Sequence, residues 1–210
     1  CMALNVLVGQ TGLVSFGHGA WFGLAAYVAA LAQREWFPGS ALAPALLALI
    51  SVALVSALFG ALILRRRGVY FSLLTLSLSA LLYVVAFRWT AVTGGENGLG
   101  GIVRPRWFGV DFESSAHYYA LTAVVAFAGI CLLWRFQRSP VGSVLVAIRE
   151  NEQRARFVGY PTNRYKLVAF TLSATLTGLA GVLLLFNNRL TSAEPISVAF
   201  SGELLAMVVI

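Results

Sequence analysis

Residues 41–64 read ALAPALLALISVALVSALFGALIL, a run of 24 residues without a single Asp, Glu, Lys or Arg. An α-helix rises about 1.5 Å per residue, so this run can cross a hydrocarbon core roughly 30 Å thick. Four further runs are equally free of charge, and they cover residues 11–33, 69–87, 114–134 and 167–188. The sequence therefore predicts an all-α, polytopic integral membrane protein with five full transmembrane helices.

The two ends of the chain carry shorter apolar stretches. Met2 to Val8 follows directly on Cys1, and Val198 to Ile210 has 13 residues, fewer than the roughly 20 that a span needs. We interpret these stretches as partial spans at cut ends. Residues 1–210 are then one transmembrane domain, present as a fragment.

Composition excludes most soluble classes of protein. Of the 210 residues, 59% are hydrophobic and 11% are charged, against about 25% charged in ordinary soluble domains. A net charge of +7 would suggest nucleic-acid binding in a soluble protein, but here the charges lie between the apolar runs, so we expect a bilayer and no nucleic acid. Cys1 and Cys131 cannot form a disulfide framework.

Charge asymmetry between the loops predicts the orientation. Arg65, Arg66 and Arg67 form one loop, and the segment from Arg135 to Lys166 forms another; together they hold ten basic and two acidic residues. The loops on the other side hold five of each sign. By the positive-inside rule the basic side is cytoplasmic. An alternating path through five spans also brings both basic loops to one side.

No catalytic group stands out. The chain has two histidines, no Cys or His pair at metal-ligand spacing, and no phosphate-binding loop with a lysine. We therefore expect no enzyme activity, no metal and no nucleotide bound by this chain.

Polar and small residues within the spans leave two interpretations open. Ser15, Gly19 and Gly23 are spaced by four, which favours close helix packing over a substrate path. His18 is a functional candidate as an intramembrane ionisable residue, although a neutral, hydrogen-bonded ring is the more common case. Ser72, Thr75 and Ser79 form a hydroxyl stripe that either faces a path or bonds to neighbouring backbone.

Two segments outside the spans are informative. The glycine-rich residues 93–99 suit a surface turn better than a ligand-lining loop. Residues 139–161 begin with Ser139 and Pro140, an N-cap followed by a first helical residue, and predict a short amphipathic cytoplasmic helix. Such a helix could dock into another protein or rest on lipid headgroups.

Four blocks of residues together resemble branched-chain amino-acid ABC transporter permeases of the LivM type. The first block joins Asn5, Gly9 and Gly12 to residues 15–19, and the second joins 67–71 to Thr75 and Leu76. The third runs through residues 93–99, and the fourth extends from Arg149 to Gly181. The resemblance covers nearly the whole chain.

The resemblance implies one permease subunit of an importer in the bacterial inner membrane. Its partners would be a second permease subunit, two ATP-binding subunits and a periplasmic substrate-binding protein, and ATP would bind to those partners. The ATPase-coupling residues would be Arg149, Glu150, Asn151, Glu152, Arg154, Ala155 and Gly159. The candidate substrate path would include Ser15, Gly17, His18, Gly19, Tyr70, Thr75, Thr93, Gly94, Gly95, Asn97 and Gly98.

Three other functions compete with a branched-chain amino-acid importer. Urea and short-amide importers have similar permeases. The hydroxyl stripe alone would also fit an ATP-independent secondary transporter or channel, and the segment from Arg135 to Lys166 would also fit a membrane anchor for a cytoplasmic partner.

Overall fold

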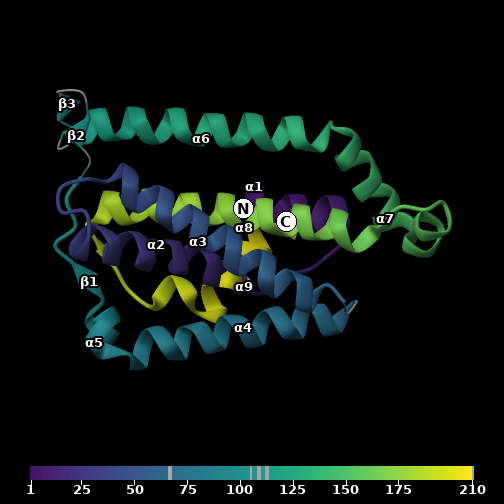
Figure 1. Ribbon diagram of the computed structural model, residues 1–210, viewed down its shortest axis with the longest axis horizontal. Helices are drawn as coiled ribbons and strands as arrows, with labels where there is room; N and C mark the ends of the chain where they lie inside the picture. The colour runs from purple at the N-terminus through teal and green to yellow at the C-terminus, as the bar shows by residue number, and fades with distance from the viewer. Residues whose placement is uncertain (66–67, 105, 108–109, 112–113, 210) are drawn as a thin grey trace.

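The computed structural model describes residues 1–65, 68–104, 106–107, 110–111 and 114–209, and it is helical almost throughout (Figure 1). The α-helices are α1 (Met2–Asn5), α2 (His18–Glu35), α3 (Leu42–Ile63), α4 (Val69–Arg88), α5 (Thr90–Thr93), α6 (Ser115–Gln137), α7 (Pro140–Phe157), α8 (Thr162–Asn188) and α9 (Val198–Val209). A π-helix, η1 (Val6–Gln10), follows α1, and 3-10 turns form η2 (Gly95–Asn97) and η3 (Glu194–Ile196). Short strands pair as β1 (Leu99–Gly100) with β4 (Leu190–Thr191), and β2 (Arg106–Trp107) with β3 (Val110–Asp111), both antiparallel.

Four helices in the described part of the chain, α3, α4, α6 and α8, are long and apolar enough to cross a membrane. Helix α3 shows how the sequence divides its two faces. Its buried residues recur every four positions, and so do its exposed large apolar residues, which suits contact with helices on one side and lipid on the other. The buried series is Pro44, Ala48, Val52, Ser56 and Gly60, and the exposed series is Leu46, Ile50, Leu54, Leu58 and Leu62.

The remaining predicted span, residues 11–33, differs from the expectation. Helix α2 begins only at His18 and ends at Glu35, so it has 18 residues and contains Gln33 and Arg34. Most of α2 is buried between α3, α8, η3 and α9, rather than facing outward. A helix enclosed by protein needs small side chains more than apolar ones, and α2 is accordingly rich in alanine and glycine.

Close packing in the centre depends on small residues and one aromatic hub. Gly178 of α8 lies against Ala25 and Val52, where an added Cβ would stand 3.1 Å from the nearest atom. Phe170 of α8 is fully buried and meets Trp21 and Phe71 edge to face, with ring centroids 5.8 and 6.2 Å apart. These contacts join α2, α4 and α8 into one core.

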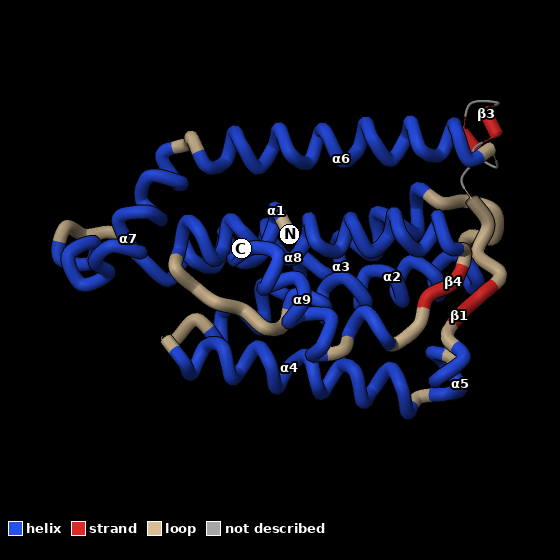
Figure 2. The backbone as a smooth tube through the Cα atoms, turned by 180° about the vertical axis from the view of Figure 1, so that it is seen from behind, coloured by secondary structure: helices blue, strands red, loops and turns tan. Residues whose placement is uncertain are grey.

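Helix α6 lies beside this core rather than in it. Figures 1 and 2 both show α6 running antiparallel to α8 at one edge of the bundle, and only Tyr118 and Leu133 on it are buried. At its outer end the Tyr118 hydroxyl donates to the carbonyl of Leu183, 2.6 Å away. Arg104 stacks over the Tyr118 ring and donates to the carbonyls of Phe186 and Asn187, near the end of α8.

The basic loops lie at one end of the bundle, as the charge pattern predicts. Figure 1 shows α7, the end of α3 and the start of α4 at the same end of the bundle, opposite the short strands. Arg65 lies in the connection between α3 and α4, while Arg66 and Arg67 of the predicted loop lie outside the described residues, as do Glu113 and Ile210. The arrangement of the ends agrees with a path through the membrane that places α7 on the cytoplasmic side.

Candidate functional site

The predicted cytoplasmic segment, residues 139–161, forms α7, which has two parts. Ser139 caps the first part: its side chain accepts a hydrogen bond from the Gly142 N–H, and Pro140 is the first helical residue, as expected. Asn151 interrupts the helix with φ −154° and ψ 96°. Its side-chain oxygen accepts from the Arg154 N–H at 2.9 Å, so Asn151 is the N-cap of a second, short helical part. The apolar spacing of residues 141–148 does not reveal this break.

Gly159 ends the second part with a Schellman motif. The Gly159 N–H donates to the carbonyl of Arg156 and the Tyr160 N–H to that of Ala155, at 2.9 and 3.1 Å. Gly159 has φ +98°, a left-handed conformation that favours glycine, and nothing lies within 4 Å of where its Cβ would be. The backbone conformation therefore accounts for this glycine without any partner protein.

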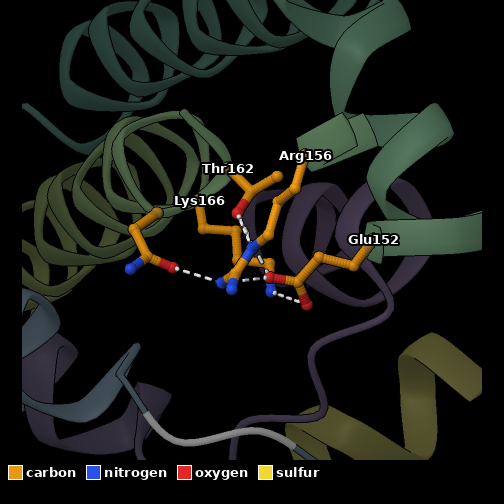
Figure 3. A network of polar contacts seen from close by, with 5 residues as sticks. Glu152, Arg156, Thr162 and Lys166 are labelled. Atoms are coloured by element: carbon orange, nitrogen blue, oxygen red, sulfur yellow. Dashed lines mark hydrogen bonds and ion pairs between the residues drawn. The ribbon is translucent and has the colours of Figure 1, made fainter. Parts of the chain in front are cut away.

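Glu152 fastens the second part of α7 to the start of α8 (Figure 3). Its carboxylate accepts from the Lys166 ammonium at 2.7 Å, the Arg156 guanidinium at 3.0 Å and the Thr162 hydroxyl at 3.2 Å. Arg156 also donates to the Asn163 side chain at 3.4 Å. The Lys166 side chain is 4% exposed and that of Glu152 is 14% exposed, so this ion pair is largely closed to solvent, whereas Arg156 is 44% exposed. Glu152 acts inside the chain, and Arg156, Thr162 and Lys166 are contributors that the coupling prediction did not include.

The residues at the end of α7 divide into an exposed tip and a buried anchor. Phe157 is 90% exposed and Val158 is 71% exposed, which is unusual for large apolar side chains outside the bilayer. Arg154 and Gly159 are exposed beside them, whereas Ala155 is buried at 6%. Ala155 and Gly159 therefore do not form one exposed small-residue face, because the helix ends between them. We refer to Phe157, Val158 and Gly159 as the α7 tip.

Arg149 links the first part of α7 to the N-terminal segment. Its guanidinium donates to the carbonyl of Gly9 in η1, and its alkyl chain packs over Gly12, which has φ +69°. Glu150, beside it, is exposed. Of the seven predicted coupling residues, Glu152 and Ala155 are the two shielded from solvent. Arg149 and Asn151 are exposed although their side chains bond within the chain, and Glu150, Arg154 and Gly159 are also exposed.

Residues 12–17 are non-helical although they lie within a predicted span. Two hydroxyls of α4 bond to their backbone: the Phe16 N–H donates to Thr75 Oγ1 at 3.2 Å, and Ser72 Oγ donates to the carbonyl of Val14 at 2.7 Å. Ser79 serves the segment before α9 in the same way, donating to the carbonyl of Ile196 at 2.8 Å. Irregular backbone at membrane depth requires such partners or a water-filled cavity. The hydroxyl stripe therefore bonds to backbone, one of the two roles left open by its sequence.

His18 is fully buried at the start of α2, between two serines. Its Nδ1 lies 3.0 Å from Ser15 Oγ and its Nε2 lies 2.8 Å from Ser173 Oγ. Ser173 Oγ donates to the carbonyl of Ala3 at 2.6 Å, so it accepts from His18 Nε2–H, and Nδ1 is left to accept from Ser15. A neutral ring satisfies every partner, and His18 joins α1, α2 and α8.

The predicted path glycines lie at close backbone contacts. A Cβ on Gly17 would stand 2.6 Å from the carbonyl oxygen of Thr75, and one on Gly19 equally close to that of Pro195. Ser15, Gly17, His18 and Thr75 thus gather around the break before α2, and Gly19 directly follows His18. Tyr70, at 72% exposure, faces outward from α4 and does not join them. Close backbone contacts account for both glycines.

The glycine-rich loop lies at the opposite end of the bundle. Thr93 Oγ1 donates to the carbonyls of Ala86 and Trp89, and Gly94, Gly95 and Gly98 all have positive φ. Gly98 approaches the backbone of Thr191 so closely that a Cβ would overlap its carbonyl, next to the β1–β4 pairing. Asn97 is exposed. This loop is a tight turn, as its composition favours, and it is separate from the residues around His18.

Comparison with known proteins identifies the family. The model of the branched-chain amino acid transport system permease component matches residues 1–210. The high-affinity branched-chain amino acid transport system permease proteins LivM of Salmonella typhimurium and Escherichia coli are 30% and 29% identical over the whole chain, which spans 54% of their length. The ribose import permease RbsC of Bacillus subtilis is 33% identical over 47% of this chain and 29% of its own. No solved structure matches.

The family match and the apolar helices agree on the kind of protein. Permease relatives and four long apolar helices in the described part of the chain make it a multi-pass protein of the inner membrane. The chain belongs to the family of permease components of branched-chain amino acid transport systems.

Proposed function

We propose that the chain is the membrane-spanning part of an ATP-driven importer for leucine, isoleucine and valine. In this proposal it works with a second permease subunit, two ATP-binding subunits that supply the ATP site, and a periplasmic substrate-binding protein. The family match over residues 1–210 and the LivM relatives support the substrate class. Residues 139–161 are the segment that couples the permease to the ATP-binding subunits.

The observation that carries this proposal is the construction of the α7 tip. Two large apolar side chains, Phe157 and Val158, are presented to the cytoplasmic side on a short helical part. That part begins at the Asn151 cap and ends at Gly159, so its length is set at both ends. Apolar anchors on a rigid element are what a pocket in a partner protein binds most strongly.

The connections behind the tip support a role in transmitting movement. Glu152 and Lys166 join the tip to α8 by an ion pair of 2.7 Å. Arg149 joins the first part of α7 to η1, which precedes the break at residues 12–17. Closure of the ATP-binding subunits on the tip would therefore move α8 and the N-terminal segment together, and rigid elements transmit such displacements well.

The proposed function is tested by uptake into proteoliposomes that contain the full-length permease and all its partners. Leucine, isoleucine, valine and urea are compared with and without ATP. We expect ATP-dependent uptake of the three amino acids. ATP-dependent uptake of urea alone would overturn the substrate assignment, and flux that is indifferent to ATP would overturn the importer itself.

A variant pair tests the tip. Phe157→Ala removes an exposed aromatic anchor and should lower coupled uptake about tenfold or more while leaving membrane insertion intact. Val146→Ala is the matched control, because it shortens a partly exposed apolar residue in the first part of α7. This variant should not lower coupled uptake. Equal uptake by the two variants would remove the docking role assigned to the α7 tip.

A further inference from the structure

A cavity of about 490 Å³ lies in the half of the bundle away from α7. Helices α2 and α8 form one wall, and the segment from β4 through η3 to α9 forms the other. Its apolar lining includes Phe22, Leu184 and Phe200, and its carboxylates are Glu194 and Glu203. The volume falls in the range of roughly 300–1,000 Å³ that is usual for small-molecule sites.

Glu203 is an unusual residue for its position. The sequence of α9, VAFSGELLAMVV, contains no other charged residue. Ser201, two residues before it, accepts a hydrogen bond from the Gly19 N–H at 3.1 Å, so this turn of α9 is level with the first turn of α2. Glu203 is exposed on the surface of the chain and makes no ion pair with any of the residues that the structure describes.

A carboxylate at this depth does not face lipid, because the hydrocarbon core offers no counter-ion and no water. Intramembrane acidic residues turn toward a water-filled cavity, a ligand or another protein. Glu203 is part of the lining of the cavity, so its carboxylate has an alternative to lipid. The carboxylate is therefore held where a cationic group entering the cavity would meet it.

The other lining residues fit an apolar amino acid. The rings of Phe22 and Phe200, with centroids 5.5 Å apart, offer an apolar surface for a branched side chain. Asn188 Oδ1 accepts from Asn187, which leaves the amide hydrogens of Asn188 free to donate to a substrate carboxylate. The cavity thus combines an acceptor for an ammonium group, donors for a carboxylate and an apolar wall.

We propose that this cavity is a substrate site in which Glu203 binds the ammonium group of an apolar amino acid. The inference rests on the proposed importer function and adds to it a position and a residue. It also separates amino acids from urea, because a neutral amide has no positive charge for Glu203 to bind. None of the residues expected to form the substrate path belongs to this lining.

The first test measures uptake kinetics of Glu203→Gln in the full-length permease with all partners. Glu203→Gln keeps the size of the side chain and removes its charge, so we expect the KM for leucine to rise about tenfold, as for the loss of one hydrogen bond to a charged group. Glu35→Gln is the control, because Glu35 is exposed at the end of α2 beside Arg34 and does not line the cavity. Equal KM values for Glu203→Gln and wild type would overturn the site.

The second test does not depend on uptake. Glu203→Cys, in a full-length protein whose other cysteines are replaced by alanine, is treated with a membrane-impermeant cationic thiol reagent. We expect the cysteine to react, and leucine delivered by the binding protein with ATP to slow the reaction. No reaction, or a rate that leucine does not change, would overturn the site. Absence of ATP-dependent leucine uptake by the wild type would instead overturn the proposed function.

Discussion

Removal of the Glu152 carboxylate should destabilise the protein strongly, because it leaves a buried lysine without its partner. The Lys166 side chain is 4% exposed and that of Glu152 is 14% exposed. Breaking a buried ion pair by removing one partner costs about 3–5 kcal/mol. Arg156 is 44% exposed and adds little, so the lower figure applies, and we expect Glu152→Ala to lower the free energy of unfolding by about 3 kcal/mol.

The measurement is reversible unfolding of the full-length permease in mixed detergent micelles, followed by circular dichroism. Glu150→Ala is the matched control: Glu150 is exposed two residues earlier, and its loss should change the free energy by no more than about 0.5 kcal/mol.

A second variant separates the ion pair from other effects of the substitution. Lys166→Met, added to Glu152→Ala, replaces the stranded charge with an apolar chain of similar length and should recover most of the lost stability. The reasoning is refuted if Glu152→Ala costs no more than Glu150→Ala, or if the double variant is no more stable than Glu152→Ala alone.

Three further predictions concern single residues. Gly159→Ala should cost about 1 kcal/mol of unfolding free energy because of φ +98°, whereas Gly159→Asn, which tolerates this conformation better, should cost less; equal costs would contradict the backbone argument. Ser173→Ala should cost about 1–3 kcal/mol in the same assay, since it leaves His18 Nε2–H and the Ala3 carbonyl without their partner, and Thr171→Ala on the same helix is the control. Gly181→Val should prevent stable folding, since a side chain there overlaps the carbonyl of Phe22, and a folded, monodisperse Gly181→Val protein in gel filtration would show that α2 and α8 do not pack this closely.

Much of this fold follows from local sequence. The uncharged runs at residues 41–64, 69–87, 114–134 and 167–188 became helices α3, α4, α6 and α8, because a long apolar run leaves few alternatives in a membrane. The Ser139 cap and Pro140 likewise marked the start of α7 correctly. In each case the deciding signal lies within about 20 consecutive residues.

The break before α2 shows where such reasoning stops. Residues 11–33 are as free of charge as the other runs, yet 12–17 are not helical. The Phe16 N–H and the Val14 carbonyl bond to Thr75 and Ser72, about sixty residues away. A hydropathy pattern does not reveal such distant hydrogen-bond partners. The glycines at 12 and 17 were the available signal, since a glycine-interrupted apolar segment is typical of a discontinuous membrane helix.

Spacing alone does not describe the end of α7. Residues 155 and 159 are four apart and would share a face on a continuous helix, but the helix ends between them and Ala155 turns inward. The buried network of Glu152 was equally hidden, because a carboxylate in a charged segment looks the same whether it meets water or Lys166. Burial depends on how the whole molecule packs. The sequence therefore located the segment that holds the coupling residues, but it could not show which of them are exposed and which are buried against the rest of the chain.

Two sets of contacts connect α7 with the segments on either side of the break before α2, and on the proposed function this explains why the break exists. One runs from Arg149 to Gly9 in η1, and the other from Glu152 through Lys166 and along α8 to Ser173 and His18. A continuous helix through residues 6–35 would have to move as one rod. A break whose backbone is bonded by α4 hydroxyls lets η1 follow α7 while α2 stays packed against α3, because side-chain hydrogen bonds can exchange partners at little cost. On this view the break is a hinge, and the hydroxyl stripe bonds to its backbone. Thr75→Val should therefore lower coupled uptake more than it lowers the free energy of unfolding.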